Sequence, residues 1–248
     1  QYTYLSCNFL GQTGDAVLSP YALEDYGDVQ VAYLGISTPE TLTKSNPTHF
    51  QDDGGSYLYS FCEGGGGQEV QQAVDSARDD GADYVVALAH LGMEGVTPAW
   101  TSGAVIANTT GIDLVIDGHS HEAYRQQAAN LEGEPVDLVQ TGTQLVNLGC
   151  ILLDPDTGGI TVEMLPVEGD EAPVDPDTKA YLEQIYGGFE EELNRVVGST
   201  SVSLRATAEN GFDWAVRVSE TNLGDLVADA YRFALGADIG LANGGGIR

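Results

Sequence analysis

Basic residues are scarce in this 248-residue sequence. Nine lysines and arginines stand against 38 aspartates and glutamates, which gives a formal net charge of -29 at pH 7. A protein that binds the phosphate backbone of nucleic acids needs a basic surface, so we expect no nucleic-acid polymer as a partner. No apolar run reaches the ~18 residues that a membrane-spanning helix needs, so we expect no membrane span.

Cysteine is also rare. The three residues Cys7, Cys62 and Cys150 are widely spaced and form no CxxC motif, which excludes a zinc ribbon or a thioredoxin-type site. One disulfide with one free thiol, or three free thiols, both remain open. The 42% apolar content indicates a folded chain, and the length allows one large domain or two modest ones.

Short apolar segments alternate with helical patterns in the first part of the chain. Strands are predicted at 29–36, 83–90, 113–117, 136–140 and 145–153. Helices are predicted at 68–80 and 98–108, between these strands. The polar, glycine-rich segment 41–67 is predicted to be a surface loop with a short strand near 57–61. This order favours a layered α/β fold with a central sheet.

A proline-rich acidic stretch at 166–178 predicts a domain boundary. The elements predicted after it are a helix at 176–197, a strand at 199–205, a helix at 223–235 capped by Ser219 or Thr221, and a strand at 238–242. We therefore divide the chain into 1–170, a linker helix at 171–197, and the start of a second α/β domain at 198–248.

Three of the four histidines follow predicted buried strands. His90 and His119 each follow one such strand, and His121 lies two residues further on. Ligand sites in open α/β sheets form at the carboxyl ends of the strands, and neutral imidazoles bind zinc, manganese and iron, so these residues predict a metal site. In extended backbone His119 and His121 would point the same way, whereas in a sharp turn they could face two neighbouring metals. His49 lacks this context and is predicted to be exposed or structural.

Two sets of motifs resemble those of a known family. The first runs from Gly81-Ala82-Asp83 to His90-Leu91-Gly92 and continues through residues 111–121, GIDLVIDGHSH. The second comprises residues 217–226, 237–239 and 243–248, the last reading NGGGIR. The sequence resembles the 5′-nucleotidase family over essentially its whole length. In that family a calcineurin-like metallophosphoesterase domain precedes a C-terminal substrate-binding domain.

The resemblance implies a dinuclear-metal phosphohydrolase that acts on nucleotides. It assigns His90 and His119 to one divalent ion, such as zinc or manganese, and His121 to a second ion. It assigns the residues Arg217, Asn243 and Arg248 to the nucleotide substrate. Such enzymes are usually exported, so an extracellular, periplasmic or cell-surface location is expected. A 2′,3′-cyclic-nucleotide phosphodiesterase/3′-nucleotidase, a UDP-sugar hydrolase, and a non-catalytic surface binding protein on this fold remain alternatives.

The sequence also departs from the family's pattern. The family's Asp-x-His motif, metal-bridging aspartate, Asn-His-Glu motif and base-binding aromatic pair have no counterpart here. We therefore interpret the chain as an internal fragment that lacks both ends, assign it no catalytic residue, and expect it to be inactive by itself. Missing strands would expose a sheet edge and apolar faces, so self-association is expected.

Overall fold

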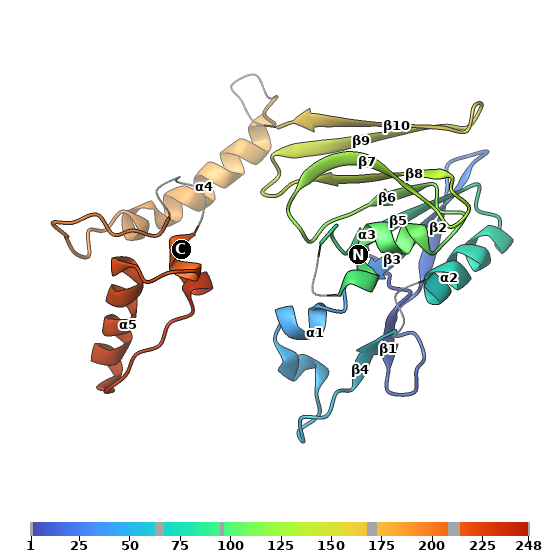
Figure 1. Ribbon diagram of the computed structural model, residues 1–248. Coiled ribbons are helices and arrows are strands. Elements are labelled where there is room, and N and C mark those ends of the chain that lie inside the picture. The colour runs from blue at the N-terminus through green and yellow to red at the C-terminus, as the bar shows by residue number, and fades with distance from the viewer. Residues whose placement is uncertain (1, 63–66, 95–96, 168–172, 208–213, 248) are drawn as a thin grey trace. The chain divides into compact units, whose positions relative to one another are not determined.

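The computed structural model describes residues 2–62, 67–94, 97–167, 173–207 and 214–247. The chain forms two compact units, Gln1–Pro173 and Val174–Arg248 (Figure 1). The first unit has a layered α/β architecture, which confirms the predicted fold class. The predicted division at 170 and 197 stays a prediction. In the described part of the chain, no helix is both long and apolar enough to cross a bilayer.

A mixed six-stranded sheet forms the centre of the first unit, in the order β2-β3-β5-β6-β8-β7. In that order the strands are β2 (Tyr21–Asp25), β3 (Gln30–Ser37), β5 (Tyr84–His90), β6 (Leu114–Ile116), β8 (Pro135–Thr141) and β7 (Ala123–Ala129). The four inner strands are parallel, and β2 and β7 pair antiparallel at the edges. The carboxyl ends of β3, β5, β6 and β8 therefore meet at one edge of the sheet.

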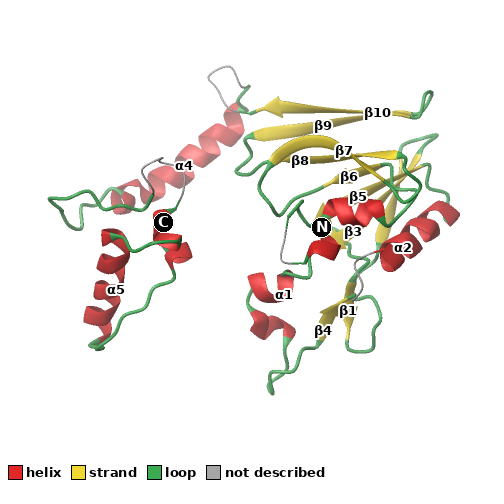
Figure 2. Ribbon diagram, viewed as in Figure 1, coloured by secondary structure: helices red, strands yellow, loops and turns green. Residues whose placement is uncertain are grey.

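Two helices cover one face of this sheet (Figure 2). The first is α2 (Gly67–Asp79), which buries Val70, Val74 and Ala77 as its apolar periodicity predicts. The segment predicted as one helix at 98–108 is instead a 3-10 turn, η2 (Pro98–Trp100), followed by α3 (Ser102–Ala107). The break falls at Thr101, which is extended and caps α3 by accepting the N–H of Ala104.

An antiparallel hairpin covers the opposite face. It consists of β9 (Asn147–Asp154) and β10 (Gly159–Pro166), and its side chains pack on Tyr84, Val86 and Val139 of the sheet. Neither β10 nor β7 was predicted from the sequence. Strand β7 escapes prediction because it is an exposed edge strand with a polar sequence. It lacks the alternation of apolar and polar residues by which a half-buried strand is predicted.

Short elements occupy the segment that was predicted as a loop. They are α1 (Thr41–Lys44), the 3-10 helix η1 (Pro47–Phe50), and β4 (Tyr59–Phe61), which pairs with β1 (Phe9–Gly11) in a small separate sheet. The short strand predicted near 57–61 is thus confirmed. Residues 64–66 of the predicted glycine connector lie outside the described residues, and Gly67 begins α2.

The second unit contains α4 (Pro176–Leu193), α5 (Asn222–Leu235) and the 3-10 helices η3 (Ala215–Arg217) and η4 (Gly244–Gly246). Thr221 caps α5 by accepting the N–H of Gly224, as one of the two predicted caps, and Gly236 ends it in the left-handed conformation. The strands predicted at 199–205 and 238–242 are wrong. A strand needs a partner for its backbone groups, and no sheet forms among the described residues of this unit.

Candidate functional site

His90 and His119 lie side by side at the carboxyl edge of the sheet. His90 is the last residue of β5, and His119 follows β6, the next strand in the sheet. Their ring centroids are 5.1 Å apart at an interplanar angle of 64°. His90 packs against Gly118, where an added Cβ would lie 2.9 Å from its Nδ1. The structure therefore brings together two of the three predicted metal ligands, and Gly118, in the loop after β6, leaves room for the His90 ring.

The backbone after β6 makes the sharp turn rather than the extended path. His119 has φ 83° and His121 has φ 61°, both in the left-handed region that few non-glycine residues adopt. His121 is exposed, whereas His119 is partly buried. The two side chains thus do not share one face of an extended strand, and the role of His121 as a ligand stays a prediction.

Asp117 connects the loops that carry these histidines. Its Oδ1 accepts backbone N–H groups from Leu91, Gly92 and Gly118 at 3.0, 3.2 and 2.7 Å. Its Oδ2 accepts the hydroxyl of Tyr124 at 2.9 Å. Sequence reasoning missed this residue as a site residue, although an aspartate directly after a buried strand and before Gly-His was a usable signal.

Glu40 is a second buried carboxylate at this edge. Its Oε2 lies 3.1 Å from His119 Nε2 and 3.6 Å from Lys44 Nζ. Sequence reasoning missed its role because 79 residues separate it from His119. Its position just after β3 was the available signal, since β3 ends at the same edge as β5.

The pKa of His90 is lowered from its ordinary value. Partial desolvation of the ring is the largest cause, and the neighbouring His119 adds to it. His90 is therefore neutral at pH 7. Neutral imidazole is the form that binds a metal ion.

The donor set at this edge fits part of a metal site. Two adjacent imidazoles suit zinc or manganese. Across the described ranges, however, no three His, Cys, Asp or Glu side chains are arranged to hold an ion. The residues described here thus supply a histidine pair rather than a full ligand set.

The second unit brings Arg217 and Asn243 to one turn. A Cβ on Gly244 would lie 1.9 Å from the carbonyl oxygen of Val216, so only glycine allows η4 to approach η3. A Cβ on Gly245 would lie 3.8 Å from Arg217 Nε, which places the guanidinium beside the turn. Asn243 Oδ1 accepts the N–H of Gly245. The third predicted substrate residue, Arg248, lies outside the described residues.

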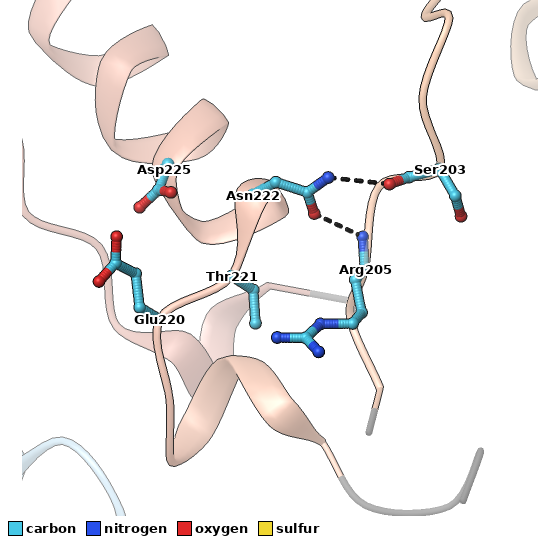
Figure 3. Close-up of a pocket in the computed structure, with 6 residues that line it drawn as sticks. All are labelled: Ser203, Arg205, Glu220, Thr221, Asn222 and Asp225. Atoms are coloured by element: carbon cyan, nitrogen blue, oxygen red, sulfur yellow. Dashed lines mark hydrogen bonds between the residues drawn. The ribbon is translucent and has the colours of Figure 1, made fainter. Parts of the chain in front are cut away.

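A cavity of about 640 Å³ opens at the start of α5 (Figure 3). Its lining residues are Ser203, Arg205, Glu220, Thr221, Asn222 and Asp225. Asn222 connects the two walls, because its side chain accepts from Arg205 N and donates to Ser203 O. None of these residues was a predicted site residue, and two carboxylates beside one arginine do not favour a phosphate.

Comparisons with known proteins agree with the motifs. Residues 196–248 match the family model described as 5'-nucleotidase, C-terminal domain. The trifunctional nucleotide phosphoesterase protein YfkN of Bacillus subtilis is 28% identical over 249 aligned residues, which cover 96% of this chain and 16% of the relative. The structure of a 5'-nucleotidase precursor from Thermus thermophilus matches with a TM-score of 0.67 and 21% identity, over 95% of this chain and 46% of that chain.

The structure of the calcineurin-like phosphoesterase YfkN matches with a TM-score of 0.59 and 18% identity, over 79% of this chain and 65% of that chain. The chain thus spans less than two thirds of each of these proteins. The resemblance that the motifs predict is confirmed. Over residues 196–248 the chain matches the 5′-nucleotidase C-terminal domain, and along most of its length it is similar to proteins named as nucleotide phosphoesterases and 5′-nucleotidases.

Proposed function

We propose that the whole protein is a metal-dependent phosphoric ester hydrolase that removes phosphate from nucleotides. The observation that carries the proposal is the His90–His119 pair at the carboxyl edge of the sheet, whose ring centroids lie 5.1 Å apart. The family supports a nucleotide phosphoesterase in the broad sense. The metal dependence and the activity as a 5′-nucleotidase are our proposals.

In this proposal His90 and His119 hold one divalent ion, and His121 contacts a second one. When bound, such ions lower the pKa of water and neutralise charge on a phosphoryl group. Within the described ranges the chain supplies no third ligand with suitable geometry. We therefore propose that this chain alone binds a divalent ion weakly and hydrolyses no nucleotide.

Arg217, Asn243 and Arg248 would hold the nucleotide. A guanidinium forms two parallel hydrogen bonds to a phosphate, and Arg217 lies beside the glycine turn. Glycines 244–246 have no side chains, so the backbone of that turn is accessible to a ligand. We further propose an extracellular, periplasmic or cell-surface location, which the name of the Thermus relative as a precursor supports.

We also propose that the chain by itself self-associates. The apolar stripe of α4 is exposed in the described unit, with Tyr181, Phe189 and Leu193 between 57% and 73% accessible. Sedimentation velocity would test this, with oligomers expected at micromolar concentration. A strictly monomeric chain would contradict it.

The proposed function is tested by zinc and manganese titration together with phosphate release. For the metal-loaded whole protein we expect phosphate release from nucleoside monophosphates, which His119→Ala abolishes. His49→Ala is the matched control, because that histidine is exposed in η1 and is not one of the predicted ligands. If the loaded protein releases no phosphate from any nucleotide, cyclic nucleotides included, the hydrolase proposal fails.

A further inference from the structure

The backbone of Glu40 is held in place at the edge where the histidines lie. β3 and β5 are parallel, and Ser37 at the end of β3 pairs with His90. The N–H of Glu40 donates to Thr38 Oγ1 at 3.2 Å, and its carbonyl oxygen accepts from Lys44 N at 2.7 Å. The residue is only 5% exposed. Its carboxylate is therefore a buried group on a constrained segment.

This carboxylate contacts one particular ring nitrogen of His119. Glu40 Oε2 is 3.1 Å from His119 Nε2. An ionised carboxylate only accepts hydrogen bonds, so this contact with ionised Glu40 corresponds to the tautomer of His119 with the proton on Nε2. In a neutral imidazole the other nitrogen, Nδ1, then keeps its lone pair. Nδ1 is therefore the nitrogen of His119 that is able to bind an ion.

The backbone of His119 makes such a partner necessary. A non-glycine residue at φ 83° is in a sparsely populated conformation that persists only where the surroundings hold it. The ring contacts His90, and its nitrogen contacts Glu40. Asp117 fixes the start of the same turn by accepting the N–H of Gly118.

The geometry favours positioning over ligation for Glu40. Together with the two histidines it makes three metal-type side chains, yet none of the triplets in the described residues has the arrangement that holds an ion. Histidines that bind metals commonly donate their second ring N–H to a carboxylate, which fixes the tautomer and raises the basicity of the ligand nitrogen.

We propose that Glu40 is the positioning residue of His119, which holds its Nε2–H and presents Nδ1 to a divalent ion. The part concerning the ion rests on the proposed function. The hydrogen bond between the two side chains does not, so the two parts are tested separately.

The hydrogen bond is tested by NMR of the metal-free 248-residue chain with 15N-labelled histidine. The wild type should show a slowly exchanging Nε2–H signal, assigned to His119 by its loss in His119→Gln. Glu40→Ala should remove the signal, and Glu40→Gln should keep it because the amide oxygen still accepts. Glu132→Gln, on an exposed turn, is the charge-matched control and should change nothing. A signal that survives in Glu40→Ala overturns the inference.

The consequence for the ion is tested by zinc titration of the same variants, followed by their histidine NMR signals. Glu40→Ala should weaken zinc binding about 10- to 100-fold in the wild-type background. It should cause no further loss in the His119→Ala background. An equal loss in both backgrounds would show a general structural role and overturn the positioning role. A wild-type chain that shows the hydrogen bond but binds no zinc would instead overturn the proposal that this chain alone binds a divalent ion, and would leave the hydrogen bond standing.

Discussion

At the residue scale, Asp117 links the two loops that carry His90 and His119. Its two oxygens accept three backbone N–H groups and the Tyr124 hydroxyl, and the side chain is buried. These donors belong to the loop after β5, the loop after β6, and β7. One carboxylate therefore sets the distance between the loops that carry His90 and His119.

We expect Asp117→Ala to lower the free energy of unfolding of the first unit by about 3–5 kcal/mol, because each buried donor that loses its acceptor costs ~1–3 kcal/mol. Urea denaturation followed by circular dichroism measures this change. Asp156→Ala, on the exposed turn between β9 and β10, should change it by less than ~0.5 kcal/mol. Equal small effects of both variants would contradict the role of Asp117.

Two glycines of the NGGG turn should respond differently to alanine. At Gly244 a Cβ would lie 1.9 Å from the carbonyl oxygen of Val216, whereas at Gly246 it would meet nothing within 4 Å. Gly244→Ala should therefore displace the turn and the amide signal of Arg217 in a 1H–15N spectrum. Gly246→Ala should leave those signals in place. The same spectrum for both variants would refute the close approach of η4 to η3.

The lowered pKa of His90 gives a pH dependence with a defined sign. The native state resists protonation of this partly desolvated ring, whereas the unfolded chain takes up the proton near its ordinary value of 6.5. Stability should therefore be unaffected above this value and fall as the pH drops below it. Urea midpoints at pH 7.5 and 5.5 should differ more for the wild type than for His90→Gln. Identical pH slopes would rule out this contribution.

At the scale of elements, the β9–β10 hairpin protects one face of the sheet with alternate residues. Val162 faces the sheet and is 2% exposed, while Leu152, on the paired strand, is 60% exposed. The alternation follows from the period of two in a strand. Val162 and, in part, Ile160 of β10 thus contribute to the core, although this strand was not predicted.

Val162→Ala should cost about 1–3 kcal/mol, because it removes buried methyl groups and leaves a cavity. Leu152→Ala should cost less than ~1 kcal/mol, although it removes more atoms, since the side chain is mostly in water. Thermal or urea unfolding of both variants measures the difference. A larger loss for Leu152→Ala would mean that the hairpin packs with its other face inward.

Predictability differed between elements for a physical reason. The helix at 68–80 and the strand at 83–90 could be predicted because the spacing of their apolar residues shows which side chains are buried. The structure has both elements. The segment at 199–205 also looks like a strand by composition, but no strand pairs with it among the described residues. Pairing is a relation between distant segments, so local composition does not determine it.

At the scale of the whole molecule, the net charge of -29 opposes compaction. Added salt screens this repulsion, since the Debye length falls from ~10 Å at 0.1 M to ~3 Å at 1 M. The melting temperature should therefore rise when sodium chloride is increased from 0.1 to 1 M. The same series at pH 4.1, the sequence pI, should show a smaller salt effect. A melting temperature that falls with salt at pH 7 would contradict the argument.

The sequence by itself determined the α/β order, the edge at which His90 and His119 meet, and the similarity to 5′-nucleotidases, because local periodicity and short motifs carry this information. Only the tertiary structure decided that Glu40 lies 3.1 Å from His119, that Asp117 joins two loops, and that the turn at His119 is left-handed. The physical reason is distance along the chain. A hydrogen bond between residues 40 and 119 depends on how parallel strands bring their ends together, which no local pattern encodes.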